Sequence, residues 1–161
     1  MQPSTKLIIG VYVGAKRGEG KTAVESAELV ADYGIRGDAH AGRDTHRQIS
    51  LFEIEVLREL AAEGIEVSPE SISANLITEG VNLNDLGPGA CRRIGEAMIE
   101  LAEARKPCGS LTKLDRRLPK RLYQRCGLMG RILKGGFVCP GAEVEPLSEP
   151  VGQEQFNPET T

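Results

Sequence analysis

Both histidines of this 161-residue chain lie in one polar, glycine-rich segment, residues 34–47. Glycine lets a backbone approach a ligand closely, and an arginine guanidinium binds phosphate, carboxylate or another oxyanion through paired hydrogen bonds. Because polar loops of this kind often carry function, we predict a binding site here. The charged or titratable side chains of the segment are Arg36, Asp38, His40, Arg43, Asp44, His46 and Arg47.

Two other interpretations of the same segment stay open. Asp38, His40 and His46 could hold a divalent metal, because imidazole and carboxylate groups are common ligands. Alternatively, Asp38 only accepts hydrogen bonds from loop amides, and His40 packs beneath the loop.

One of the four cysteines, Cys108, lies in the segment Arg105-Lys-Pro-Cys-Gly109. Nearby cations lower the pKa of a thiol, and the thiolate is the form that attacks or accepts sulfur. Cys91 precedes two arginines, so local charge alone does not choose between these two thiols. Cys126 and Cys139 are predicted to be structural. No pair has C-x-x-C spacing, which argues against a zinc ribbon or a thioredoxin-like site.

The segment from Gly14 to Thr22, GAKRGEGKT, is similar to a phosphate-binding loop. That motif needs four residues between its first glycine and the Gly-Lys pair, whereas Gly14 leaves five and Ala15 occupies the required position. We therefore predict a hairpin or a loop on the substrate side, not an ATP site.

Positive charge is concentrated in residues 105–134, which contain ten Lys or Arg and one acid, Asp115. This segment carries +9, and the remainder of the chain carries −12. The concentration predicts either a solvated basic helix or a surface that docks an anionic partner. The chain has no tryptophan and only three Phe and three Tyr, so a stacking platform for single-stranded nucleic acid is difficult to build.

Short apolar runs between Gly and Pro turns predict many short strands. We place strands at residues 7–13, 27–31, 76–78, 90–94, 97–102, 131–133 and 142–144. One helix is predicted to begin at Ser50, with Glu53 completing a capping box, and to end at Gly64. Ser68-Pro-Glu70 predicts a further helical turn, and residues 111–125 could be helical, interrupted at Pro119.

This pattern predicts a mainly β fold, a closed or nearly closed β-barrel of short strands with a few helices. We expect one domain over residues 1–147 and a loosely ordered tail over 148–161. Since no apolar run reaches 18 residues and no signal peptide is evident, we expect a cytoplasmic protein with free thiols and no membrane contact.

Several motifs, in order along the chain, resemble a stand-alone bacterial MOSC-domain protein, a family named after the C-terminal part of molybdenum cofactor sulfurase. They are Gly34-Ile-Arg-Gly-Asp-Ala-His40, Arg47-Gln-Ile-Ser50, Asn75-Leu-Ile-Thr-Glu-Gly80, Arg105-Lys-Pro-Cys108, Gly127-Leu-Met-Gly-Arg-Ile-Leu-Lys-Gly-Gly136 and Pro140-Gly141. The resemblance covers roughly residues 5 to 146 and implies a barrel-like β fold. Longer family members have a threonine where this chain has Ala102.

The resemblance also implies a site. Cys108 would carry sulfur as a persulfide or would ligate the metal, molybdenum or tungsten, of a bound molybdenum cofactor (a pyranopterin). The basic side chains would hold the anionic parts of this cofactor, and Asp38 and His40 would order the loop and tune protonation. The implied cofactor-binding residues are Arg36, Asp38, His40, Arg43, Arg47, Arg105 and Lys134.

These expectations leave three functions open. The first is a cofactor carrier or sulfur-transfer module. The second is a partner-dependent molybdoenzyme that reduces N-hydroxylated compounds, and the third is a non-catalytic module with a basic docking surface. Because the chain contains no pyridoxal-phosphate desulfurase or ferredoxin segment, the first two need a sulfur donor, a molybdoenzyme or an electron donor as a partner protein.

Overall fold

The computed structural model describes residues 5–16, 19–42, 47–107 and 109–147. Arg43, His46 and Cys108, together with the predicted tail at 148–161, lie outside these ranges. Among the described residues, no helix is both long enough and apolar enough to cross a membrane.

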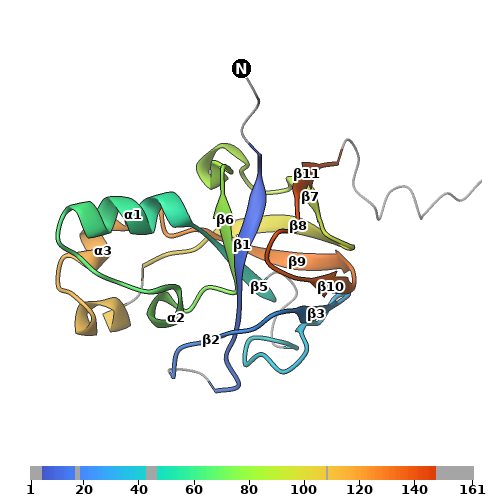
Figure 1. Cartoon of the computed structure of the whole chain (residues 1–161), viewed down its shortest axis with the longest axis horizontal. Helices are drawn as coiled ribbons and strands as arrows, with labels where there is room; N and C mark the ends of the chain where they lie inside the picture. Colours follow the sequence, from blue (N-terminus) through green and yellow to red (C-terminus); the bar gives the residue numbers. More distant parts are fainter. Residues whose placement is uncertain (1–4, 17–18, 43–46, 108, 148–161) are drawn as a thin grey trace, which may run out of the picture.

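Eight strands form one sheet and three form a second (Figure 1). The order of the larger sheet is β11-β7-β8-β9-β5-β6-β1-β2. Its strands, in chain order, are β1 (Leu7–Val13), β2 (Thr22–Ala23), β5 (Ile49–Glu53), β6 (Leu76–Glu79), β7 (Cys91–Ile94), β8 (Ala97–Ala104), β9 (Leu128–Lys134) and β11 (Val144–Pro146). The smaller sheet has the order β10-β3-β4 and comprises β3 (Ala27–Val30), β4 (Gly34–Ile35) and β10 (Gly136–Val138). The mainly β prediction is thus confirmed.

The prediction of a closed barrel is wrong, because neither sheet closes on itself. The chain just before β11 reaches β1 through an isolated bridge between Leu7 and Glu143 and through a few backbone hydrogen bonds, such as Val144 N to Lys6 O at 2.9 Å. β11 is only three residues long, and Pro146 within it has no amide hydrogen to donate. Too few pairing groups remain there for a continuous ladder.

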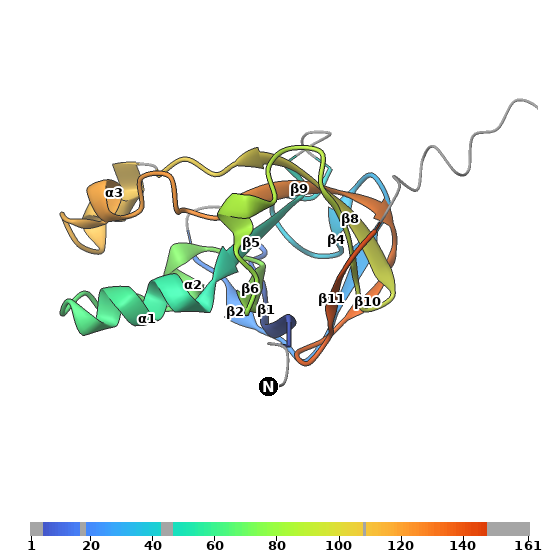
Figure 2. The ribbon, with the colours of Figure 1, turned by 90° about the horizontal axis from the view of Figure 1, so that it is seen from above.

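The helices gather at one side of the molecule, away from β3 and β10 (Figure 1 and Figure 2). They are α1 (Ile54–Ala62), α2 (Pro69–Ile72) and α3 (Leu118–Arg121), with the 3-10 turns η1 (Leu83–Asp85) and η2 (Gly109–Lys113). The helical turn predicted at Ser68 is confirmed as α2, which Ser68 caps together with Ser71. The possible helix over 111–125 is two short pieces, with Pro119 in the first turn of α3.

The start of α1 is a correction. Ser50 was expected to cap this helix, but it lies inside β5, where its amide donates to Asn75 Oδ1 at 3.0 Å. The residue at the N-cap is Glu53, and its side chain makes no capping hydrogen bond. The predicted end is confirmed, since Gly64 has a φ of +83° and its amide donates to Ala61 O at 3.0 Å.

Two apolar clusters stabilise this arrangement. The larger one joins residues of both sheets, including Ile8, Leu29, Ile99 and Ile132. The second lies beneath the helices and is formed by Phe52, Val56, Leu57, Leu60, Ile65, Ile72, Ala74, Ile77, Leu111, Leu118, Leu122 and Cys126. Cys126 is therefore a core residue as predicted, whereas Cys139 is exposed.

Gly127 provides a test of the packing between β9 and β5. Its φ is +86°, and a Cβ added there would overlap the Leu51 carbonyl oxygen. A left-handed conformation costs a non-glycine residue about 1–3 kcal/mol, and the overlap adds to that cost. Gly127→Ala should therefore destabilise the protein clearly more than Gly64→Ala, whose φ is similar but whose Cβ would meet nothing within 4 Å. Chemical denaturation of both variants measures this, and equal losses would contradict the described contact.

Candidate functional site

The buried carboxylate of Asp38 is the centre of a hydrogen-bond network. Its Oδ1 accepts from the Gly14 amide at 3.0 Å, from Lys21 Nζ at 2.8 Å and from Asn75 Nδ2 at 3.2 Å. Its Oδ2 lies 3.1 Å from the His40 amide and 3.3 Å from His40 Nδ1. Because the donors come from widely separated segments, this one side chain fixes the loop at residues 34–42 against β1 and the start of β6.

Lys21 is the cation of this network, and sequence analysis did not identify it. Its side chain is 2% exposed and that of Asp38 is fully buried. An isolated buried charge is very unfavourable, so a buried lysine needs a partner of this kind. Lys21 leads into β2 and not into a helix, so the segment lacks the strand-to-helix architecture of a phosphate-binding loop.

His40 lies between the two charged partners. Its Nδ1 is 3.2 Å from Lys21 Nζ and 3.3 Å from Asp38 Oδ2. An ammonium group only donates hydrogen bonds and a carboxylate only accepts them. A bare Nδ1 can therefore accept from Lys21, and a protonated Nδ1 can donate to Asp38. The side chain is 33% exposed, so the ring is also partly accessible from solvent.

The network also explains the protonation state of Asp38. Burial by itself would raise the pKa of this carboxyl group. Hydrogen bonds from His40, from the Gly14 amide and from Lys21, together with the charge of Lys21, outweigh burial and hold the pKa of Asp38 well below its ordinary value. Asp38 is consequently a fixed negative charge at all ordinary pH values.

Local structure places these groups. Gly14 ends β1, and a Cβ there would overlap the Gly20 carbonyl oxygen, so the turn at this position needs glycine. Asn75 connects three segments. Its backbone amide donates to Ser50 Oγ at 3.0 Å. Its side-chain Nδ2 donates both to Tyr12 O at 3.0 Å and to Asp38 Oδ1. The sequence signal for Asn75 was its place at the head of the Asn75–Gly80 motif, but nothing in the motif indicated its partners.

The predicted basic residues are dispersed. Arg36 is exposed and pairs with Glu28 at 2.7 Å, and Arg47 is exposed and pairs with Glu103 at 3.2 Å. Lys134 is exposed at the far end of β9. Met129 pairs with Ser50, the hydrogen-bond partner of Asn75. Lys134 lies five residues beyond Met129, and five residues correspond to about 17 Å along a strand. The structure therefore brings together Asp38 and His40, and it places Lys134 elsewhere.

Arg105 is anchored through both its backbone and its side chain. Its backbone amide donates to Gly127 O at 2.9 Å, and its Nη2 donates to Ile72 O at 2.6 Å. Ile72 is the last residue of α2, and Asn75, which donates to Asp38, follows it by three residues. The other terminal nitrogen, Nη1, is buried and has no hydrogen-bond partner within the described part of the chain. Lys106, the next residue, is exposed.

The structure argues against a reactive thiol at Cys91, although this cysteine, like Cys108, has basic neighbours in the sequence. The thiol is buried, and burial raises its pKa; Glu100 adds to this effect, while Arg92 opposes it. A thiol with a raised pKa is a poor nucleophile.

The predicted metal alternative gains no support from the residues that the structure describes, where no group of three or more His, Cys, Asp or Glu could hold a metal ion. The third proposed ligand, His46, lies outside those residues. The Lys21 ammonium already compensates the negative charge of the Asp38 carboxylate, so this carboxylate needs no metal ion for charge balance.

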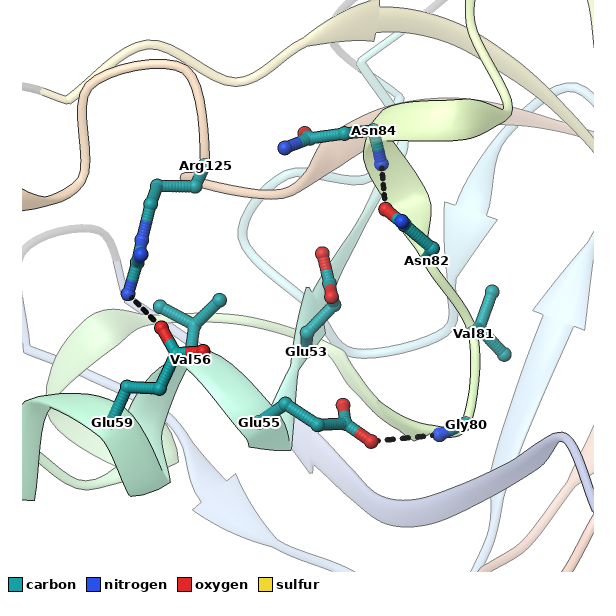
Figure 3. Close-up of a pocket in the computed structure, with 9 residues that line it drawn as sticks. All are labelled: Glu53, Glu55, Val56, Glu59, Gly80, Val81, Asn82, Asn84 and Arg125. Carbon is teal, nitrogen blue, oxygen red and sulfur yellow. Dashed lines mark hydrogen bonds and ion pairs between the residues drawn. The ribbon is translucent and has the colours of Figure 1, made fainter. Parts of the chain in front are cut away.

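Two cavities lie at the helical side of the molecule. The first, about 370 Å³, is bounded by the end of β5, by α1, by the connection after β6 and by Arg125 (Figure 3). In it, Glu55 Oε2 accepts from the Gly80 amide at 2.8 Å, and Arg125 pairs with Glu59 at 2.6 Å. Burial and the neighbouring Glu55 raise the pKa of Glu53. The second cavity, about 620 Å³, is mainly basic. Asp38 and His40 line neither of them.

The chain is similar to known proteins in its sequence pattern and in its fold. The family model of the MOSC domain matches residues 36–145. The structure is similar to that of YuaD from Bacillus subtilis, with a TM-score of 0.79, 21% identity, and coverage of 91% of this chain and 98% of that one. It is also similar to YiiM from Geobacillus stearothermophilus (TM-score 0.71, 21% identity, 91% and 77% coverage) and to YiiM from Escherichia coli (0.71, 22%, 91% and 72%). At these identities the structural likeness establishes the fold alone. No curated protein matches the sequence.

Removal of Lys21 tests the charge balance of the network. Lys21→Met leaves the Asp38 carboxylate buried without its cation, and breaking a buried pair in this way costs about 3–5 kcal/mol. The double variant Lys21→Met/Asp38→Asn should regain part of that loss, because it no longer buries an uncompensated charge. Chemical denaturation of the single and double variants measures the coupling. A loss below about 1 kcal/mol for Lys21→Met would be inconsistent with a buried pair.

The pKa of Asp38 predicts a specific acid dependence. Since the folded-state pKa lies below the unfolded-state value of about 3.9, the stabilisation is fully present above that value and is lost as pH falls through the folded-state pKa. The difference in unfolding free energy between wild type and Asp38→Asn should therefore be constant from pH 7 to about 5 and should shrink below about 4. A difference that persists unchanged at pH 2 would disprove this origin of the stability.

Proposed function

Because this chain belongs to the MOSC domain family, we propose that it binds a molybdenum cofactor next to the Asp38 network and acts as a cofactor carrier or a sulfur-transfer module. The family is associated with proteins of the molybdenum cofactor. The observation that carries the proposal is the guanidinium of Arg105, three residues before Cys108, which is anchored through one nitrogen and has an unsatisfied donor on the other.

The residues present fit such a group. A buried, unpartnered guanidinium nitrogen is unfavourable by itself, and an anionic group such as a phosphate or a metal-bound oxygen ligand would satisfy it. Lys106 adds a second, exposed positive charge next to it. Pyranopterin phosphate is an anion of this kind, so Arg105 and Lys106 are the first residues proposed to hold it.

Cys108 is the proposed thiolate, as a ligand to the metal or as the acceptor of a sulfur atom. The two cations that precede it in the sequence favour the thiolate form. When bound, the cofactor's metal supplies two-electron redox chemistry and ligand exchange. This chain would bind and orient the cofactor, and His40 would hold or release a proton at Nδ1 while Asp38 and Lys21 keep the imidazole in place.

The other predicted residues have secondary roles in the proposal. Arg36 and Arg47 are occupied by exposed ion pairs with Glu28 and Glu103, and such pairs contribute little to stability. Both arginines could therefore exchange their carboxylates for an anionic part of the cofactor. Arg43 belongs to the same loop, and Lys134 would contact only an extended ligand.

Cofactor retention is the decisive measurement. The protein is mixed with molybdenum cofactor released from a molybdoenzyme and is separated by gel filtration, and the bound metal and pterin are then quantified. Wild type and Cys139→Ser, which removes an exposed cysteine outside the proposed site, should retain the cofactor equally. Cys108→Ser and Arg105→Gln should each retain at least about tenfold less, the scale of removing a strong charge-assisted contact. Equally small retention by all four proteins would refute the proposal.

A second arm separates sulfur transfer from simple carriage. It uses the Cys139→Ser background, because an exposed thiol would otherwise take up sulfur too. In incubation with a persulfide donor, the Cys108 thiolate would attack the outer sulfur, the S–S bond of the donor would break, and the donor would leave as a thiol. Intact-mass analysis should then show one added sulfur atom, which Cys108→Ser abolishes. Cofactor retention without sulfur uptake would leave the carrier role alone, and uptake that persists in Cys108→Ser would remove this cysteine from the proposal.

A further inference from the structure

We propose that the basic cleft between the C-terminal end of α1 and the α3 region binds a small molecule that carries two or more adjacent phosphate groups. The cleft has a volume of about 620 Å³, within the range of small-molecule sites. It is lined by Glu63, Arg116, Arg117, Lys120, Arg121 and Arg125. This proposal does not rest on the proposed function.

The charge of the lining is the first argument. Five cations and one carboxylate give the cleft a net charge of +4. Arg121 pairs with Glu63 at 2.9 Å, and Arg117 pairs with Asp115 at 2.8 Å. In the part of the chain that the structure describes, Arg116 and Lys120 form no such ion pair. A cleft that concentrates one sign of charge attracts oppositely charged ligands.

Two of these cations, Arg117 and Arg116, also act on Asp115, the acid closest to them in sequence. Hydrogen bonds from Arg117, with the charges of Arg117 and Arg116, lower the pKa of this carboxyl group to about 2, although burial opposes the shift. Arg117 therefore stabilises a carboxylate that lies within hydrogen-bond distance of it.

The chemistry of the donors favours phosphate. Arginine presents a planar fork that matches two oxygens of one phosphate, and lysine binds phosphate as a point charge. Two or three linked phosphates place several negative charges within a few ångströms, which suits the two cations without an ion pair among the described residues, Arg116 and Lys120, together with the three arginines that line the same cleft. A single carboxylate would balance only one of these two cations.

The walls of the cleft are held in place before any ligand arrives. Leu118 and Leu122 of the α3 region are fully buried and pack in the cluster that contains Leu57 and Leu60 of α1. The ion pairs of Arg121 with Glu63 and of Arg125 with Glu59 join the same two regions. Figure 1 and Figure 2 both show α1 and α3 at the same side of the molecule. The backbone that carries the cations is therefore already ordered, and a ligand would have to order only their side chains.

Calorimetric titration of the full chain with inorganic tripolyphosphate tests the proposal, with pyrophosphate and orthophosphate as shorter probes. Binding should be one-to-one, should weaken from tripolyphosphate to orthophosphate, and should weaken as salt is raised. Arg116→Gln/Lys120→Gln should reduce the affinity for tripolyphosphate at least tenfold. The matched control Lys6→Gln/Arg93→Gln removes one lysine and one arginine from exposed positions outside the cleft and should change it less than twofold.

Three results would overturn this site: no binding at millimolar tripolyphosphate, equal loss in both double variants, or a hexaglutamate peptide that binds the wild type as tightly as tripolyphosphate. The last result would assign the cleft to an acidic protein segment. Thermal unfolding of each variant verifies that it is folded. Cys108→Ser should bind tripolyphosphate normally, so failure of the cofactor proposal and failure of this one are distinguishable.

Discussion

One buried carboxylate determines how the loops of this protein meet. Asp38 has no exposed side-chain surface, and it remains charged because Lys21 and several hydrogen-bond donors surround it. A buried pair of this kind contributes little net stability compared with apolar packing. Its effect here is to hold three segments at fixed positions relative to one another. Its donors are the amide of Gly14 in the turn after β1, Lys21 before β2 and Asn75 before β6.

This geometry gives His40 a defined role. Its Nδ1 contacts an ammonium donor and a carboxylate acceptor at nearly equal distances, so two partners orient the ring. The side chain of Arg105 donates to Ile72 O, three residues before Asn75, and its buried Nη1 has no hydrogen-bond partner in the described part of the chain. The unsatisfied nitrogen supports the proposal that an anionic cofactor binds here, since Cys108 follows Arg105 by three residues.

The positive segment predicted from the sequence is divided by the fold. Arg131 pairs with Asp32, and Arg117, Arg121 and Arg125 each find a carboxylate. Arg105 donates to a backbone carbonyl instead. Of the other cations in this segment, Arg116 and Lys120 line the cleft beside α3, whereas Lys134 lies at the far end of β9. The positive charge is therefore distributed over several places, which include the stretch before Cys108 and the cleft at the helical side.

The sequence alone was sufficient to predict the strand-rich fold, the end of the helix at Gly64, the turn at Ser68 and the polar loop around Asp38, because each depends on neighbouring residues. It could not identify Lys21 and Asn75 as partners of Asp38, because these contacts join residues 17 and 37 positions apart. The open sheet and the buried state of Cys91 also depended on how distant segments pack. Local patterns specify conformation and polarity, whereas the environment of each charge is decided by the tertiary structure.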